Sequence, residues 1–256
     1  MKSSLFNVTS SAECLKLIQS GANVNGVDSM GNTPLHCAKS DEVAAILLQN
    51  GAKVYLQNKL EETPLFFARN AGIALLYIIN GASVSTVNSF LYTPLFFTIS
   101  DVAASILIRA GSDPNHRNKW NETPLFYCRT KEIAIVLLNA GAYLFVVNDF
   151  GQTPLHKIKN SEVAKFYIQE GLDVDCIDGI GNTPLHYASE DIVLTELLLK
   201  ENANVNIQNH KGYTALHYSQ SKEVARALIG AGANINLRDS GGLTAMEYNS
   251  AANLHK

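Results

Sequence analysis

The chain has 256 residues, of which 46% are hydrophobic and 17% charged, and its formal net charge is −3. This hydrophobic content is too high for a disordered protein, and the charge is too close to neutral for a protein that coats nucleic-acid phosphates. No run approaches the roughly 20 apolar residues that a membrane helix needs, and the first residues lack the apolar core of a secretory signal. We therefore expect a cytoplasmic protein that binds neither nucleic acid nor a membrane.

The cysteines suggest no metal site and no disulfide framework. The spacings between them match neither a zinc-binding motif nor a disulfide-rich scaffold, and cytosolic thiols normally stay reduced. The four residues are Cys14, Cys37, Cys128 and Cys176. We expect no metal and no cofactor.

The chain is built from an internal repeat, which decides how the rest of the sequence is interpreted. The tripeptide Thr-Pro-Leu occurs six times at a spacing of 30 residues, beginning at Thr33, Thr63, Thr93, Thr123, Thr153 and Thr183. Weaker versions begin at Thr214 and Thr244, after one repeat of 31 residues. Counting back by the same spacing places Ser3 in the threonine position, so the register covers the chain from its third residue.

Each repeat predicts two helices in chain order. Thr33 suits a helix N-cap and Pro34 the first helical turn, where the missing N–H of proline costs nothing. Ser40 then suits the N-cap of a second helix, with Asp41 and Glu42 near its positive end. Good capping residues stand at the equivalent position in most other repeats: Asn70, Ser100, Thr130, Asn160 and Ser221.

The second helix is followed by an extended finger. Val43, Ile46 and Leu47 form an apolar stripe on the helix, and Gly51 suits the left-handed residue that ends it. In the 31-residue repeat, Asn202 replaces this glycine. Asp or Asn, which tolerate turn conformations, stand in the finger of every repeat, at Asp28, Asn58, Asn88, Asn118, Asn148, Asp178, Asn209 and Asp239.

These features resemble the ankyrin repeat family over essentially the whole chain. Thr-Pro-Leu-His, with His36, His156 and His186, and Gly-Ala-x-Val-Asn, from Gly21 to Asn25, are similar to the signatures of that family. The resemblance implies an all-α repeat solenoid, an ankyrin-type stack of helix–turn–helix–finger units with about eight to nine repeats including atypical caps. The usual unit of the family has about 33 residues, so we expect a shortened first helix here.

The resemblance also implies one ankyrin repeat domain over residues 1–256. We divide it into an N-terminal cap repeat (1–32), seven internal repeats (33–243) and a truncated C-terminal cap (244–256). Each repeat should contact mainly its two neighbours.

The histidines are the first candidates for chemistry. His36, His156, His186 and His217 occupy equivalent positions, and stacked helices about 8–10 Å apart would hold them too far from one another to share a zinc ion. We expect each of them to brace its own turn. The sequence has no nucleophile elbow, phosphate-binding loop or zinc-protease motif. We therefore predict that the protein is not an enzyme and keep an unrecognised hydrolase only in reserve.

The positions that vary between repeats indicate a binding surface. The residue three before each threonine, at the tip of the finger, is large and apolar in six successive repeats: Met30, Leu60, Phe90, Trp120, Phe150 and Ile180. A contiguous exposed apolar stripe usually marks an interaction site, and aromatic residues are typical anchors. The alternative is that each of these side chains packs on the neighbouring finger.

Aromatic residues are concentrated around the same fingers. In three consecutive repeats the histidine and its successor are replaced by Phe66-Phe67, Phe96-Phe97 and Phe126-Tyr127. We expect one ring of each pair to lie in the core. Tyr92 stands at a position that resembles a target-contacting site of ankyrin binders. Charged residues nearby suggest a polar rim: Lys59, Glu61, Glu62, Lys119, Glu122 and Asp149.

These observations predict a set of partner-binding residues: Met30, Leu60, Phe90, Tyr92, Trp120, Glu122, Phe150 and Ile180. The resemblance implies a non-catalytic protein–protein interaction module that binds a partner protein along a concave face of fingers and first helices, and we expect it to be a monomer when free. Two alternatives stay open: an inhibitory or immunity-type subunit that blocks a partner enzyme or toxin, and a bacterial or viral effector that acts on a host protein in the host cytosol.

Overall fold

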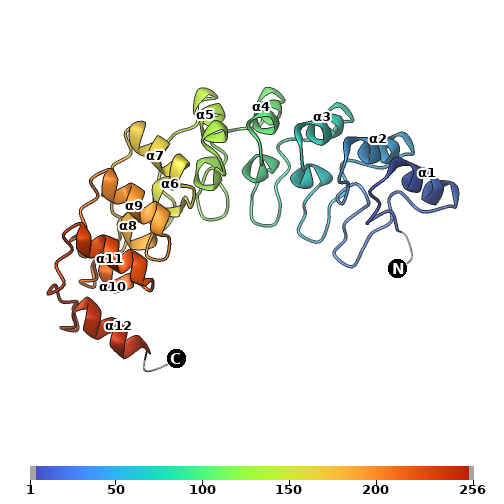
Figure 1. Cartoon of the computed structure of the whole chain (residues 1–256). Coiled ribbons are helices and arrows are strands. Elements are labelled where there is room, and N and C mark those ends of the chain that lie inside the picture. The colour runs from blue at the N-terminus through green and yellow to red at the C-terminus, as the bar shows by residue number, and fades with distance from the viewer. Residues whose placement is uncertain (1–3, 254–256) are drawn as a thin grey trace. The chain divides into compact units, whose positions relative to one another are not determined.

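The computed structural model describes residues 4–253, which contain helices, turns and loops, with no strand beyond an isolated bridge between Arg238 and Thr244. Within that range the chain forms two compact parts. The first part holds residues up to 119 together with 132–142, and the second part holds 120–131 and the residues from 143 onward. Figure 1 shows the helices of each part following one another in chain order.

Helices of nine residues form the second helix of each repeat. They are α1 (Ser11–Gln19), α2 (Asp41–Gln49), α3 (Ala71–Ile79), α4 (Asp101–Arg109), α5 (Lys131–Asn139), α7 (Ser161–Gln169), α9 (Ile192–Lys200) and α11 (Lys222–Gly230). Predicted N-caps are present: the Ser40 side chain accepts a hydrogen bond from the amide of Val43, and the Asn70 side chain accepts one from the amide of Ile73. The helices thus begin where short polar side chains can satisfy free amides.

The first helix of most repeats is a single turn, as the short repeat predicted. In the three repeats that carry a Phe pair or Phe-Tyr it is a 3₁₀ helix: η1 (Pro64–Phe67), η2 (Pro94–Phe97) and η3 (Pro124–Tyr127). In three repeats that carry His it is α-helical: α6 (Pro154–Lys157), α8 (Pro184–Tyr187) and α10 (Ala215–Tyr218). Residues 34–37 form a turn, and α12 (Ala245–Asn253) ends the described chain.

Helices at equivalent positions pack on one another within each part. In the first part α1, α2, α3 and α4 contact in succession, and η1 contacts η2. In the second part α7, α9 and α11 form one layer, the long-helix layer. The other layer, called here the short-helix layer, is formed by η3, α6, α8, α10 and α12. Val43 and Leu47 of the predicted apolar stripe are buried, and Ile46 is half-buried. The all-α repeat stack is therefore confirmed, whereas the division into cap and internal repeats stays a prediction.

Left-handed residues end the long helices. Gly51 has a φ of 87°, and Asn202, which replaces the glycine in the longer repeat, has a φ of 65°. A glycine has no Cβ and adopts this conformation without steric cost, and asparagine is one of the few other residues that tolerate it. The chain then turns into the finger.

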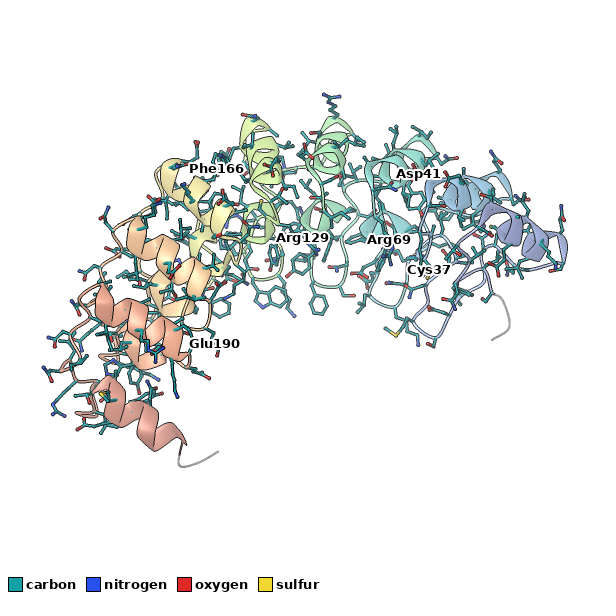
Figure 2. The ribbon with its side chains drawn as sticks, in the orientation of Figure 1. Cys37, Asp41, Arg69, Arg129, Phe166 and Glu190 are labelled. Carbon is teal, nitrogen blue, oxygen red and sulfur yellow. The ribbon has the colours of Figure 1, made fainter. Side chains whose placement is uncertain are left out.

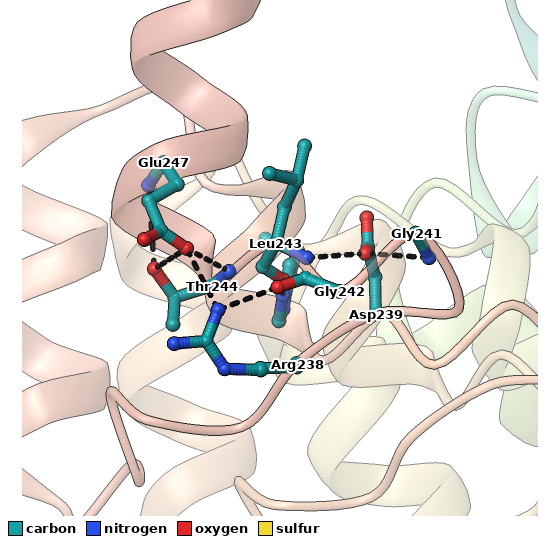
Figure 3. A network of polar contacts seen from close by, with 8 residues as sticks. Arg238, Asp239, Gly241, Gly242, Leu243, Thr244 and Glu247 are labelled. Atoms are coloured by element: carbon teal, nitrogen blue, oxygen red, sulfur yellow. Dashed lines mark hydrogen bonds and ion pairs between the residues drawn. The ribbon is translucent and has the colours of Figure 1, made fainter.

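Each finger is shaped by its Asp or Asn. In the last finger one carboxylate oxygen of Asp239 accepts hydrogen bonds from the amides of Gly241 and Leu243, both at 2.9 Å (Figure 3). The same pair of bonds, to the second and fourth residues onward, is made by Asp28, Asn58, Asn88, Asn148, Asp178 and Asn209. The residue at the finger tip lies inside this turn, so its position is set by local chemistry.

The last repeat keeps the same capping arrangement with a different side chain. Glu247 stands where other repeats have His or Phe, and its carboxylate accepts hydrogen bonds from the amide of Thr244 at 2.8 Å and from the Thr244 hydroxyl at 2.9 Å (Figure 3). The guanidinium of Arg238 lies 3.2 Å from the same carboxylate oxygen. This is a capping box that needs no residue from a following repeat.

Candidate functional site

The backbone of each finger tip is held by the next finger along the chain. The carbonyl oxygen of the tip residue accepts a hydrogen bond from a backbone amide in the following finger turn, over 2.8 to 3.1 Å. This holds for Met30, Leu60 and Phe90 in the first part and for Trp120, Phe150 and Ile180 in the second part. The predicted row of tip residues is thus attached to a fixed backbone within each part.

Most of these tip side chains face solvent. Phe150 is 58% exposed, Ile180 56% and Met30 52%, and Leu60 and Phe90 are also exposed. Trp120 is half-buried. The alternative left open by the sequence, in which a tip side chain packs on its neighbours, therefore applies mainly to this ring. Each part therefore presents apolar groups to water at regular intervals, and exposed apolar stripes of this kind usually mark interaction sites.

Aromatic rings support the finger face of the first part. Tyr92 packs edge-on against Phe96, with ring centroids 5.0 Å apart, and against Phe97, at 5.4 Å. Phe66 is buried and lies 5.9 Å from Phe97, while Phe67 is exposed. The first ring of each pair is therefore in the core, as predicted, and the second reaches the surface or its edge. These edge-on arrangements are favourable for ring quadrupoles.

Glu122 does not lie on an exposed rim, which corrects the expectation from its charge. Its side chain is 1% exposed. One oxygen lies 2.6 Å from Nζ of Lys157 and 3.0 Å from Nδ2 of Asn148, and the other accepts a hydrogen bond from the hydroxyl of Tyr127. A buried carboxylate requires such partners, and Glu122 finds them on the next finger and on two successive short helices.

Glu62 is also buried, and its carboxylate also has hydrogen-bond partners. Its carboxylate accepts hydrogen bonds from the side-chain amides of Asn58, at 3.1 Å, and Asn88, at 3.0 Å. Glu62 and Glu122, each just before a threonine, accept a hydrogen bond from the side-chain amide of the Asn in the following finger turn, Asn88 and Asn148 respectively. The carboxylates of Glu62 and Glu122 therefore join fingers within their respective parts, and neither lies in a polar rim.

Sequence reasoning missed Lys157. Its ammonium group lies 5.5 Å from the centroid of the Tyr127 ring as well as against Glu122. Glu122 thus holds the ammonium group of Lys157 beside the aromatic ring of Tyr127 on the short-helix layer of the second part. The signal in the sequence was the occurrence of Lys in a position where the other repeats that begin with threonine have Phe, Tyr or Cys.

A row of basic residues was also missed. Six residues after the threonine, on the exposed link that follows the short helix or turn, stand Lys39, Arg69, Arg129 and Lys159. Arg69 and Arg129 are labelled in Figure 2, where Asp41 marks the start of the long helix α2. None of the four forms an ion pair within residues 4–253. Their common offset from each threonine could have revealed the row.

The second part has a hollow between two of its fingers. It measures about 370 Å³ and is lined by Asp149, Phe150, Gly151, Gln152, Asp178, Gly179, Ile180 and Tyr187. Nε2 of Gln152 donates to the hydroxyl of Tyr187 over 3.0 Å, and this hydroxyl donates to the Asp178 carboxylate over 2.6 Å. Burial would raise the pKa of Asp178, but the hydrogen bonds from Tyr187 and two backbone amides outweigh it and lower the pKa. Asp178 is therefore a carboxylate anion at neutral pH.

The histidines brace their own turns, as predicted, and also reach the next repeat. Nδ1 of His36 accepts a hydrogen bond from the backbone amide of Thr33 at 3.0 Å, so the ring proton lies on Nε2. Nε2 donates a hydrogen bond to the carbonyl oxygen of Glu62 at 3.0 Å. His156, His186 and His217 repeat this arrangement. Burial lowers the pKa of His36, His156 and His186, although the bond to a carbonyl oxygen opposes it.

The Phe-containing repeats lack these bonds. Where Phe66, Phe96 and Phe126 replace histidine, the buried hydroxyl oxygens of Thr63, Thr93 and Thr123 have no hydrogen-bond partner. Histidine and phenylalanine fill a similar space, but only histidine can accept from the threonine and donate to the following repeat.

Within residues 4–253 no three His, Cys, Asp or Glu side chains are grouped so that they could hold a metal ion. The same residues include no helix that is long and apolar enough to span a bilayer.

Two layers of short and long helices joined by fingers define a helical repeat protein. Family profiles detect ankyrin repeats in this chain: one described as "Ankyrin repeats (3 copies)" matches residues 157–239, and one described as "Ankyrin repeat" matches residues 30–59. A comparison with curated proteins found no match. The resemblance seen in the sequence is thus confirmed. Ankyrin repeats are generally protein–protein interaction modules and are typically non-catalytic.

Proposed function

We propose that this chain is a non-catalytic module that binds a partner protein through its finger tips and short-helix layer. The observation that carries the proposal is the row of exposed apolar tip side chains on hydrogen-bonded backbones. A preorganised apolar group loses little conformational entropy when a partner covers it. We further propose that the protein works in the cytoplasm and is a monomer when free.

The second part offers the strongest anchors. Phe150 and Ile180 are exposed, and the half-buried Trp120 presents a large ring on a fixed backbone. Aromatic side chains near the centre of an interface commonly supply most of its binding free energy. The basic residues Arg129 and Lys159 would form the polar rim of the same surface. Glu122 contributes indirectly, because it holds Lys157 and Tyr127 in place.

In the first part the tip residues Met30, Leu60 and Phe90 would contact the partner, with Tyr92 held against its neighbouring rings. The alternatives predicted from the sequence, a subunit that blocks an enzyme or toxin and an effector acting on a host protein, would use these same surfaces. The identity of the partner distinguishes them.

The test begins with affinity capture from the source organism, followed by affinity measurements with the purified partner. Trp120→Ala and Phe150→Ala should each weaken binding by about 2 kcal/mol, and Met30→Ala should weaken it less if the interface centres on the second part. Val193→Ala, an exposed apolar residue on the long helix α9, is the matched control and should bind like the unmodified protein.

Melting temperatures separate binding from folding. Because Phe150 is exposed, its substitution should leave the melting temperature nearly unchanged, whereas Trp120→Ala should lower it modestly. A Trp120→Ala protein that binds normally but melts early, together with normal binding by Phe150→Ala, would overturn the proposed surface.

A further inference from the structure

We propose that the hollow between the fingers of Phe150 and Ile180 receives an arginine side chain of the partner protein. The inference rests on the proposed function, because it names the chemistry that one point of the binding surface recognises. It is carried by the shape of the hollow, its apolar walls and its two carboxylates.

Gly179 opens the hollow. Its amide donates to the carbonyl oxygen of Phe150 over 2.8 Å, and a Cβ at Gly179 would lie only 2.9 Å from that oxygen. Every other repeat has a side chain at this position: Ser29, Lys59, Ser89, Lys119, Asp149, His210 and Ser240. The glycine therefore removes the side chain that would otherwise stand between these two finger tips.

The walls suit the stem and the plane of an arginine. Phe150 and Ile180 are more than half exposed, and Tyr187 lines the hollow with its hydroxyl held between Gln152 and Asp178. A guanidinium group stacks favourably on aromatic rings, and the methylene groups of its stem pack on apolar surface. Fixed aromatic and aliphatic walls thus provide a place for both halves of this side chain.

The carboxylates of the hollow have no cationic partner within residues 4–253. Asp149 is exposed at its edge, Asp178 is 5% exposed at its base, and neither forms an ion pair within residues 4–253. Glu122, another buried carboxylate in the same part, is by contrast paired with Lys157 at 2.6 Å. A cation from outside the chain would supply the missing charge. Arginine fits better than lysine because its planar group can stack and donate to Asp149 together.

The probe for the test is Nα-acetyl-arginine amide, titrated into the isotopically labelled full chain and followed by NMR. We expect saturable shifts at millimolar concentration for the amides of Gly151, Gly179 and Ile180, and none with the citrulline analogue, which has nearly the same shape without the charge. Asp149→Asn should weaken the probe about fivefold. The control Glu162→Gln, which makes the same charge change at an exposed site on α7, should leave it unaffected.

Gly179→Ser tests the shape separately, because serine stands at the same position in three other repeats. This variant should fold, as judged by its circular dichroism, with a small shift between the two finger turns to admit the new Cβ, and it should lose the shifts of the probe. Absence of saturable shifts with the arginine probe, or equal shifts with citrulline, would overturn the inference. So would unchanged partner affinity in the Asp149→Asn variant. The proposed function would survive either result if Phe150→Ala still weakened partner binding, so the two failures are distinguishable.

Discussion

Nε2 of His186 donates a hydrogen bond to the carbonyl oxygen of Tyr213, 3.0 Å away in the following repeat. Nδ1 of the same ring accepts a hydrogen bond from the backbone amide of Thr183 at 3.1 Å. One buried side chain therefore closes its own turn and ties it to the next repeat. In a repeat protein, contacts between neighbours supply much of the stability and cooperativity, so this bond should be measurable in unfolding.

His186→Phe should lower the free energy of unfolding by about 1–3 kcal/mol, because it leaves the Thr183 hydroxyl and the Tyr213 carbonyl without partners. The change copies what the sequence already has in three other repeats. Urea denaturation followed by circular dichroism measures it. His210→Phe, on an exposed finger position, is the control and should change stability little. Equal stability of both variants would show that the bond to Tyr213 contributes nothing.

Stability should fall as the pH is lowered from about 7 to about 5. Burial lowers the pKa of His36, His156 and His186 in the folded chain, whereas in the unfolded chain each titrates near its ordinary value of about 6.5. Below that value the unfolded chain takes up protons that the folded chain does not, so the free energy of unfolding decreases. Denaturation at several pH values should show this slope, and His186→Phe should make it shallower. A stability that is constant or rises toward pH 5 contradicts the assignment.

Thr33 and Thr63 occupy the same position in two successive repeats but differ in their hydrogen bonds. The Thr33 hydroxyl lies 2.8 Å from Nδ1 of His36, while the buried Thr63 hydroxyl has no partner. Thr33→Val should therefore destabilise the protein by about 1 kcal/mol, and Thr63→Val should be neutral or stabilising by up to about 1 kcal/mol, because it removes an unsatisfied polar group. Thermal and urea unfolding of the two variants would decide. The prediction fails if both substitutions have the same cost.

Glu122 and Lys157 should be strongly coupled. Lys157→Met leaves a carboxylate that is 1% exposed without its cation. We expect a loss of about 2 kcal/mol, less than for a fully buried pair because the lysine is partly exposed. The double variant with Glu122→Gln should recover most of the loss, which gives a coupling of about 1–2 kcal/mol in a double-mutant cycle. Additive effects would mean that the contact adds no stability.

Much of the fold was predictable because its signals act over a few residues. Ser40 caps the helix that begins beside it, and Asn202 takes the left-handed conformation left by a missing glycine. The finger turns depend on bonds from Asp or Asn to amides two and four residues onward. Each of these features is decided by local chemistry and repeated at a fixed spacing, so the repeat length and the helix boundaries could be derived without tertiary structure.

The binding surface was only partly predictable. The positions of Met30, Phe150 and Ile180 at finger tips follow from the repeat, but their exposure, and the half-buried state of Trp120, depend on how the next finger packs. The burial of Glu122 depends on Asn148, Tyr127 and Lys157, of which the last is 35 residues away in sequence. Charge alone suggested a rim residue, because an isolated sequence position carries no information about which partners surround it.

The sequence by itself determined the repeat, its capping residues, its finger turns and the family to which the repeats correspond. Only the tertiary structure decided which polar groups are paired across repeats, because the partners lie about 26 to 35 residues apart in the sequence. The bond from His186 to Tyr213, the lysine beside Glu122 and the hollow beside Gly179 all arise where one finger or short helix lies against the next. Local propensity sets the conformation of each repeat, and packing between neighbours sets which of its side chains remain available to a partner.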